Sequence, residues 1–177
     1  MGVNVTVTNN ERILLPEDII VSKTDVRGVI TYANRTFMTI AGYEEHELLG
    51  KPHSIVRHPD MPRCVFKFFW ERIEAGHEIF AYVKNRAKNG DFYWVLAHAT
   101  PSYDRSGTLV GYHSSRRAPN RAALDQAIIP TYRALLGVEQ AADDRKEGMN
   151  KAYAVLVDTI GKTGMDYDQW VYTLFAL

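Results

Sequence analysis

The side chains with the most evident chemistry lie in the segment KPHSIVRHPDMP, residues 51–62. Two histidines, one arginine and one aspartate stand there among three prolines, unlike the Gly, Ser and Lys of an ordinary loop. Arg57 has a planar fork of donors that suits a phosphate group. His58 can add a donor, and Asp60 can orient Arg57 or accept from a ligand hydroxyl. The segment predicts anion recognition, although spacing alone slightly favours side chains that only lock the loop to itself.

A metal site is the second chemistry that this segment suggests. His53 and His58 are five residues apart, and Asp60 is close to both in sequence. Histidines at this spacing do not share a helical face, and no third nitrogen or sulfur ligand follows nearby, so we expect no metal. Cys64 is the only cysteine, which excludes an internal disulfide and a cysteine-ligated cluster. We expect its thiol to be inert.

Asn85 is a further polar residue whose position indicates a ligand. If Ile79, Ala81 and Val83 face the interior from a strand over residues 79–86, the two-residue period places Asn85 on the same face. A carboxamide at the end of an apolar face needs a hydrogen-bond partner. Its donor and acceptor suit the edge of a ring such as a flavin. The alternative is a strand that frays first and leaves Asn85 in water.

The elements that position these residues follow from the hydrophobic periodicity and from turn signals. Asn34 is a suitable N-cap, Gly42 and Gly76 are helix stops, and Asn89-Gly90 indicates a hairpin. Strands are predicted over residues 19–23, 29–33, 79–86, 92–103 and 108–117, and helices over residues 35–41, 44–49, 62–75, 121–136, 149–160 and 166–176. This order predicts one α+β domain, preceded by an N-terminal arm or cap at 1–17 and followed by a helical extension.

Composition excludes several classes of function. Lys and Arg number 21, as do Asp and Glu, so the charge balance indicates neither nucleic acid nor an acidic membrane as partner. The chain has no Gly-rich phosphate loop, no GxSxG and no HExxH, so we expect no enzyme. It also lacks a signal peptide and the run of about 20 apolar residues that a membrane span needs. We expect a cytoplasmic protein without direct membrane insertion.

Several strings closely resemble the PAS module of bacterial aerotaxis, or energy-taxis, receptors. The most specific are GKPHSIVRHPDMP and KNRAKNGDFYW, accompanied by FKFFW and GYHSSRR, and the resemblance spans residues 18–132. It implies a PAS fold, with a five-stranded antiparallel sheet and short helices on one face. The sensor domain would occupy residues 18–117 and the C-terminal helical extension residues 118–177. That family binds FAD non-covalently and passes the redox state of the flavin to a chemoreceptor signalling domain.

The resemblance also implies which residues hold FAD. Asn85 would meet the isoalloxazine ring, and the other implied cofactor-binding residues are Asn34, His53, Arg57, His58, Asp60 and Trp70. One departure concerns the tryptophan that related flavin PAS domains often carry just after the long helix, because Glu78-Ile79 stands there in this chain. Haem is the rival cofactor, with His77 as its ligand, and a ligand-free PAS interaction module is the other alternative.

The expected partner is the signalling domain of a methyl-accepting chemoreceptor, in the same chain or in a separate protein. A homodimer is a further option. The final segment DYDQWVYTLFAL is typical of a docking helix. It favours a stand-alone PAS protein that pairs with a separate chemoreceptor, rather than a piece of a longer receptor.

Overall fold

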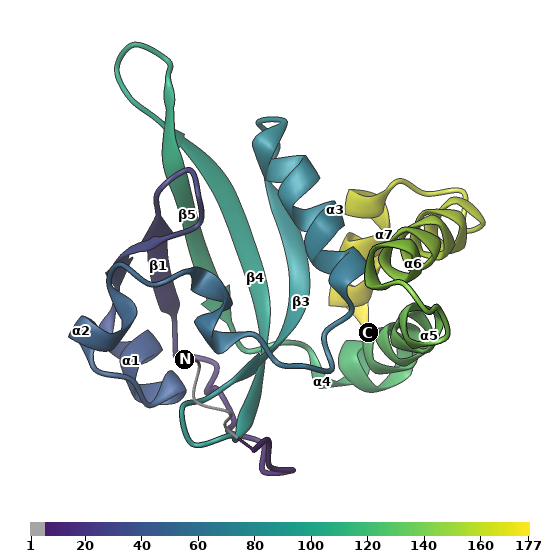
Figure 1. Cartoon of the computed structure of the whole chain (residues 1–177), viewed down its shortest axis with the longest axis horizontal. Coiled ribbons are helices and arrows are strands. Elements are labelled where there is room, and N and C mark those ends of the chain that lie inside the picture. Colours follow the sequence, from purple (N-terminus) through teal and green to yellow (C-terminus); the bar gives the residue numbers. More distant parts are fainter. Residues whose placement is uncertain (1–5) are drawn as a thin grey trace.

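A five-stranded antiparallel sheet forms one half of the molecule, with strand order β2-β1-β5-β4-β3 (Figure 1). The computed structural model describes residues 6–177. The strands are β1 (Ile20–Thr24), β2 (Ile30–Ala33), β3 (Ile79–Arg86), β4 (Phe92–Tyr103) and β5 (Leu109–Arg117). β1 pairs with β5, so the last strand lies in the middle of the sheet and joins the two hairpins. The predicted fold class is confirmed.

Short helices connect the two hairpins on one side of the sheet. They are α1 (Arg35–Ala41), α2 (Glu45–Leu48), the 3₁₀ turn η1 (His53–Val56) and the longer α3 (Arg63–Glu74). Asn34 begins α1, because its side-chain oxygen accepts from the backbone N–H of Phe37. Gly42 ends the helix in a left-handed conformation at φ 70°, which glycine adopts without strain.

Helix α3 receives its N-terminal cap from a distant part of the chain. Pro62, at the N-cap position, offers no side-chain acceptor. The Glu139 carboxylate accepts instead from the backbone N–H of Arg63 at 3.0 Å and of Cys64 at 2.7 Å. A negative group at this end also complements the helix dipole. The C-terminal extension therefore fixes the start of the helix that leaves the RHPDMP segment.

Residues 118–177 fold into a helical extension. Its elements are α4 (Arg121–Ala123), the π-helical turn η2 (Leu124–Ile128), α5 (Ile129–Gln140), α6 (Arg145–Gly161), α7 (Tyr167–Thr173) and η3 (Leu174–Ala176). The regular helix predicted over residues 121–136 is wrong in one respect, because a π turn interrupts it just before Pro130. Proline has no N–H and crowds the carbonyl four residues earlier, and a widened turn relieves both problems.

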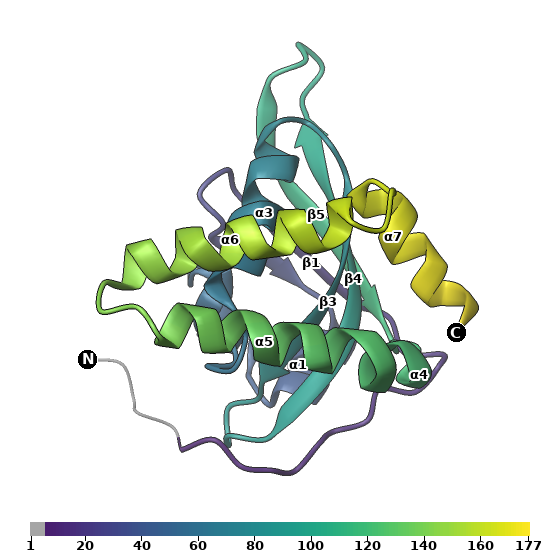
Figure 2. The same ribbon diagram turned by 90° about the vertical axis from the view of Figure 1, so that its right-hand side faces the viewer.

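The extension wraps around the β3 edge of the sheet. Figure 2 shows α5 and α6 lying side by side in front of α3 and β3. The Tyr132 hydroxyl donates to the carbonyl of Tyr82 at 2.8 Å, and that of Tyr167 donates to the carbonyl of Phe80 at 2.7 Å. An edge strand otherwise exposes unpaired carbonyls, so these tyrosines protect the edge. The boundaries of arm, sensor domain and extension stay a prediction.

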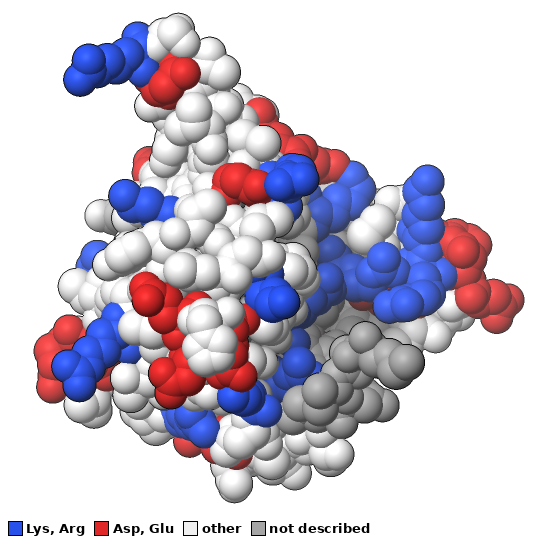
Figure 3. All heavy atoms as spheres, turned by 60° about the vertical axis from the view of Figure 1, so that its left-hand side comes forward, with Lys and Arg blue, Asp and Glu red and all other residues white. Residues whose placement is uncertain are grey.

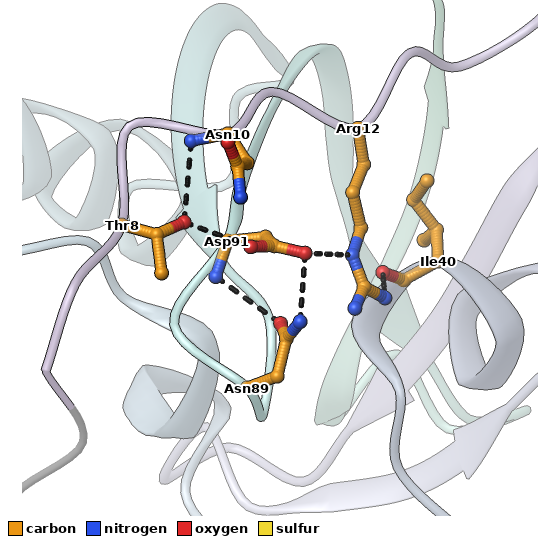
Figure 4. A network of polar contacts seen from close by, with 6 residues as sticks. All are labelled: Thr8, Asn10, Arg12, Ile40, Asn89 and Asp91. Carbon is orange, nitrogen blue, oxygen red and sulfur yellow. Dashed lines mark hydrogen bonds and ion pairs between the residues drawn. The ribbon is translucent and has the colours of Figure 1, made fainter.

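The N-terminal arm docks on the turn between β3 and β4, as Figure 4 shows. Asp91 in this turn accepts from the Thr8 hydroxyl at 2.8 Å and from the Arg12 guanidinium at 3.1 Å. Arg12 also donates to the carbonyl of Ile40, at 2.9 Å. Gly90 allows the close approach, because a Cβ there would lie 2.1 Å from the carbonyl oxygen of Thr6. Residues 1–5 of the predicted arm lie outside the described residues.

We predict that Asp91→Asn loosens the arm and leaves the sheet intact. Hydrogen bonds from Asn89, Thr8 and Arg12 lower the pKa of Asp91 to about 2, so its carboxylate strengthens arm docking above the ordinary pKa of an aspartate. That contribution is lost as pH falls through the folded pKa near 2. Hydrogen exchange should speed up at the amides of Thr8 and Arg12 in the variant. Unchanged exchange at both amides would contradict the prediction.

Candidate functional site

A cavity of about 470 Å³ lies between α3 and the inner face of the sheet. This size falls within the range of small-molecule and cofactor pockets. Its walls come from the β1–β2 hairpin, η1, α3, the inner faces of β3, β4 and β5, and one residue of α6. The lining residues are Ser22, Thr24, Arg27, Gly28, Pro52, His53, Ser54, Arg57, Arg63, Phe66, Lys67, Phe69, Trp70, Ile73, Val83, Asn85, Ala97, Ala99, Tyr112, Ser114, Arg116 and Met149.

The two broad walls of the cavity are apolar. Helix α3 contributes aromatic and aliphatic side chains, among them Phe66 and Ile73, and β3 contributes Val83. On β4 the inward residues that line the cavity are Ala97 and Ala99, and both are buried. Two methyl groups fill little volume, so space is left between helix and sheet. Flat apolar walls of this kind suit a planar ring.

Trp70 closes one side of the cavity. Its indole packs edge-on against Tyr112, with ring centroids 5.4 Å apart, and lies against the backbone of Gly28. A Cβ at Gly28 would stand 2.9 Å from the indole, and φ is +76° there, so only glycine fits this position without strain. The sequence prediction that Trp70 belongs to the pocket agrees with its place in the wall; its role toward a cofactor stays a prediction.

Basic side chains surround the cavity, although the whole chain carries a formal net charge of zero. The lining contains Arg27, Arg57, Arg63, Lys67 and Arg116, and no Asp or Glu among the described residues. Figure 3 shows Lys and Arg side chains gathered in the hollow between the sheet and the helical extension. Such a local excess of positive charge attracts an anionic ligand.

Arg57 is the basic residue that the sequence singled out, and it lines this cavity. Its guanidinium lies over the Phe66 ring, 4.5 Å from the centroid, and donates a long 3.4 Å bond to the carbonyl of Met61. Burial lowers the pKa of Arg57, and the positive charges of Arg63 and Arg145 lower it further against the opposing effect of Glu139. A bound anion would offset the repulsion between these neighbouring cations.

A buried polar network lies in the wall formed by β1, β5 and η1. The Arg116 guanidinium donates to Ser22 Oγ at 2.9 Å and to His53 Nε2 at 2.8 Å. Because guanidinium only donates, Nε2 must accept, and the proton of the neutral imidazole is on Nδ1. Burial, followed by the charge of Arg116, lowers the pKa of His53 to about 3, so the ring stays neutral at physiological pH.

Asn85 faces the cavity from β3. Ile79, Ala81, Val83 and Asn85 all lie on the buried side of the strand, as the two-residue period predicted. The side chain of Asn85 lines the cavity at 5% exposure, and its carboxamide makes no hydrogen bond to another group within residues 6–177. The amide is therefore available to a ligand.

Three residues of the predicted cofactor set do not line the cavity: Asn34, His58 and Asp60. Asn34 uses its side chain to cap α1 and to bond Val21 and Ile19 of the neighbouring segment. The interpretation that Asp60 orients Arg57 is wrong, because the Asp60 carboxylate pairs with Lys84 at 2.8 Å. Local spacing did not reveal that a lysine from β3 competes for this carboxylate.

His58 and Asp60 instead fasten the RHPDMP segment to β3. His58 is buried at 2% exposure against Phe92, and its Nδ1 accepts from the backbone N–H of Asp60 at 3.1 Å. Burial, followed by the charge of Lys84, lowers the pKa of His58 to about 4. The backbones of Arg57 and Asn85 also pair as an isolated bridge. The loop is thus locked to the neighbouring strand, and this places Arg57 beside Asn85.

The sequence interpretation missed several lining residues. Ser114 and Arg116 alternate with Tyr112 on the inward face of β5, and this alternation was a readable signal. Arg63 and Lys67 lie on the first turns of α3, one helical turn apart. Met149 reaches the cavity from α6, a contact that only tertiary packing creates.

Other side chains considered from the sequence lie away from this chemistry. Burial and the Glu139 carboxylate raise the pKa of the Cys64 thiol to about 12, which keeps it protonated and unreactive. His77 is exposed and does not line the cavity. Over residues 6–177, no group of three His, Cys, Asp or Glu side chains is arranged to hold a metal ion. The same residues include no helix with the length and apolarity of a membrane span.

Residues 30–116 match the family described as the PAS fold, so this part of the chain is a PAS domain. The blue-light photoreceptor Aureochrome1 LOV, in its dark structure, has the same fold with a TM-score of 0.54 at 22% identity, over 64% of this chain and 83% of that chain. A PAS domain from Colwellia psychrerythraea aligns with a TM-score of 0.52 at 20% identity, over 56% of this chain and 85% of that chain.

Among individual proteins, the chain is similar to the aerotaxis receptor of Escherichia coli K12, with 43% identity over 131 residues. That match includes 73% of this chain and 25% of the receptor, so the chain spans about a quarter of the relative's length. The biofilm dispersion protein of Pseudomonas aeruginosa is 33% identical over 87 residues, 49% of this chain and 21% of that protein. These similarities support a role as a PAS sensor.

Proposed function

We propose that this chain is a cytoplasmic, non-catalytic redox sensor for aerotaxis that binds FAD in the cavity beneath α3 and signals to a chemoreceptor. The observation that carries the proposal is the lining of the cavity. It combines apolar walls, a free carboxamide at Asn85, and five basic side chains without an acidic one among the described residues. The similarity to an aerotaxis receptor supports the same conclusion.

The residues present fit a flavin dinucleotide. Phe66 and Trp70 offer flat apolar surfaces to a ring, and Asn85 offers one donor and one acceptor to a ring edge. Arg57 and Arg63 suit the two phosphates, because guanidinium forks bind phosphate oxygens in pairs. A dinucleotide has two phosphates, so it can pair with more of the basic lining residues than a mononucleotide or an uncharged ligand. When bound, the flavin supplies reversible electron transfer.

Strand β3 offers a direct route from the cavity to the extension. Asn85 faces the cavity, while the carbonyls of Tyr82 and Phe80 on the same strand accept from Tyr132 and Tyr167. A change in what the Asn85 carboxamide donates or accepts would shift β3, and these two tyrosines would transmit the shift to α5 and α7. The chemoreceptor would then read the position of the extension.

The first experiment is an absorbance spectrum of freshly purified protein, followed by acid release and identification of the chromophore. We expect flavin absorbance and released FAD in a ratio near one per chain. Released haem would overturn the flavin assignment. A colourless protein that stays colourless with excess FAD would overturn the sensor proposal and leave a ligand-free interaction module.

A further inference from the structure

Arg116 is a buried cation in the wall of the cavity. It is 6% exposed, and no Asp or Glu in the described part of the chain forms an ion pair with it. Its Nη1 has no hydrogen-bond partner there either. Two neutral groups, Ser22 Oγ and His53 Nε2, accept from Nη2. Burying an uncompensated charge costs several kcal/mol, so a buried arginine is normally paired with an acidic group or used to bind a ligand.

The titratable groups that face Arg116 stay neutral. His53 has its pKa lowered to about 3, and burial raises the pKa of Tyr93. Burial lowers the pKa of Arg116 itself to about 10, which leaves it charged at physiological pH. The positive charge is therefore present in the cavity wall, and no acidic side chain among the described residues pairs with it.

The neighbourhood of Arg116 distinguishes it from the other basic residues of the cavity. Ser114, two residues earlier on β5, also lines the cavity and has a buried hydroxyl without a partner among the described residues. By contrast, Arg27 is 79% exposed and pairs with Asp25. Arg57 and Arg63 lie near the start of α3, where Glu139 provides an acidic neighbour. Arg116 and Ser114 are thus buried donors, whereas Arg27, Arg57 and Arg63 each have an acidic neighbour.

We propose that Arg116, assisted by Ser114, binds the electron-rich edge of the ligand ring and raises the reduction potential of the bound flavin. This proposal rests on the proposed function. Uptake of two electrons and one proton from an external reductant leaves one negative charge on the flavin ring. A fixed cation in a low-dielectric wall favours that reduced state over the neutral oxidised state.

The test compares Arg116→Met with Arg117→Met. Arg117 is the next residue on β5 and is exposed on the opposite face, so it controls for loss of an arginine in the same strand. FAD affinity is measured by fluorescence titration, and the midpoint potential by dithionite reduction against a reference dye. We expect Arg116→Met to weaken FAD binding at least threefold. We also expect it to lower the equilibrium ratio of reduced to oxidised bound flavin at least tenfold. For a two-electron couple that tenfold change equals about 30 mV. Arg117→Met should change neither value.

The melting temperature of the flavin-free protein separates this role from a structural one. If Arg116 serves to bind the ligand, its unpaired charge destabilises the flavin-free protein. Flavin-free Arg116→Met should then melt no lower than wild type. A variant that melts lower or fails to fold indicates a structural arginine and overturns the proposal. So does a folded variant with unchanged potential and affinity. Wild-type protein that binds no FAD would instead refute the proposed function.

Discussion

Arg57→Ala is expected to weaken FAD binding roughly tenfold to hundredfold, the loss of a charge-assisted hydrogen bond worth about 1.5–3 kcal/mol. Arg57 lies over Phe66 in the wall of the cavity, near the positive charges of Arg63 and Arg145 and the negative charge of Glu139. Burial and the two neighbouring arginines disfavour the charged form of Arg57 in the free protein, whereas a bound phosphate would stabilise it. Removal of the guanidinium therefore affects the complex more than the free protein. The measurement is the dissociation constant for FAD at low and at physiological salt.

Two controls sharpen the Arg57 experiment. Arg57→Lys keeps the charge and loses the planar fork, so its affinity should lie between wild type and Arg57→Ala. Arg105→Ala removes an exposed arginine at the far β4–β5 turn and should leave FAD affinity unchanged. Equal affinity of wild type and Arg57→Ala would show that Arg57 serves only to hold the loop. A fall of similar size for Arg105→Ala would indicate a non-specific effect of net charge.

Tyr132→Ala is expected to lower the free energy of unfolding by roughly 3–5 kcal/mol, as for a buried aromatic side chain replaced by alanine. Tyr132 is 7% exposed and packs against Trp94 on the outer face of the sheet. Its hydroxyl also donates to the carbonyl of Tyr82 on the edge strand. The substitution leaves a cavity in the core and also removes the hydrogen bond to the edge strand β3. The melting temperature should fall by about 10 °C in a chain of this size.

Tyr132→Phe separates the two contributions. It keeps the ring and removes only the hydroxyl, so its cost should be about 1 kcal/mol. Tyr172→Ala is the matched control from the same extension, because Tyr172 is 73% exposed and should change stability by less than about 0.5 kcal/mol. If Tyr132→Ala and Tyr172→Ala proved equally mild, the extension would not depend on Tyr132 for its docking to the sheet. Urea unfolding followed by circular dichroism measures all three variants.

The two variants also address different parts of the proposed signalling route. Arg57→Ala acts at the cavity, whereas Tyr132→Ala acts where the extension meets β3. If signalling passes along β3, Tyr132→Phe should keep FAD affinity near that of wild type. It should nevertheless reduce the difference in protease sensitivity of α5 between oxidised and reduced protein. An undiminished redox-dependent difference in the variant would count against Tyr132 as a link in this route.

Local patterns in the sequence determined most of the elements. The periods of two and 3.6 residues, together with Asn34, Gly42 and Gly76, define strands and helices close to those observed. The same reasoning placed Asn85 on the inward face of β3, because side-chain alternation is a property of a single strand. The similarity of KPHSIVRHPDMP and KNRAKNGDFYW to aerotaxis receptors added the fold and the expected cofactor.

Only the tertiary structure decided which polar side chains meet in one place. Asp60 pairs with Lys84, and Glu139 caps α3; both contacts join segments that are far apart in sequence. Spacing within a loop cannot reveal such partners, because the competing group comes from another element. Arg116 illustrates the same limit. Its position on β5 was readable from the sequence. Its burial beside Ser22 and His53, with no acidic partner within residues 6–177, depends on how three separate segments pack.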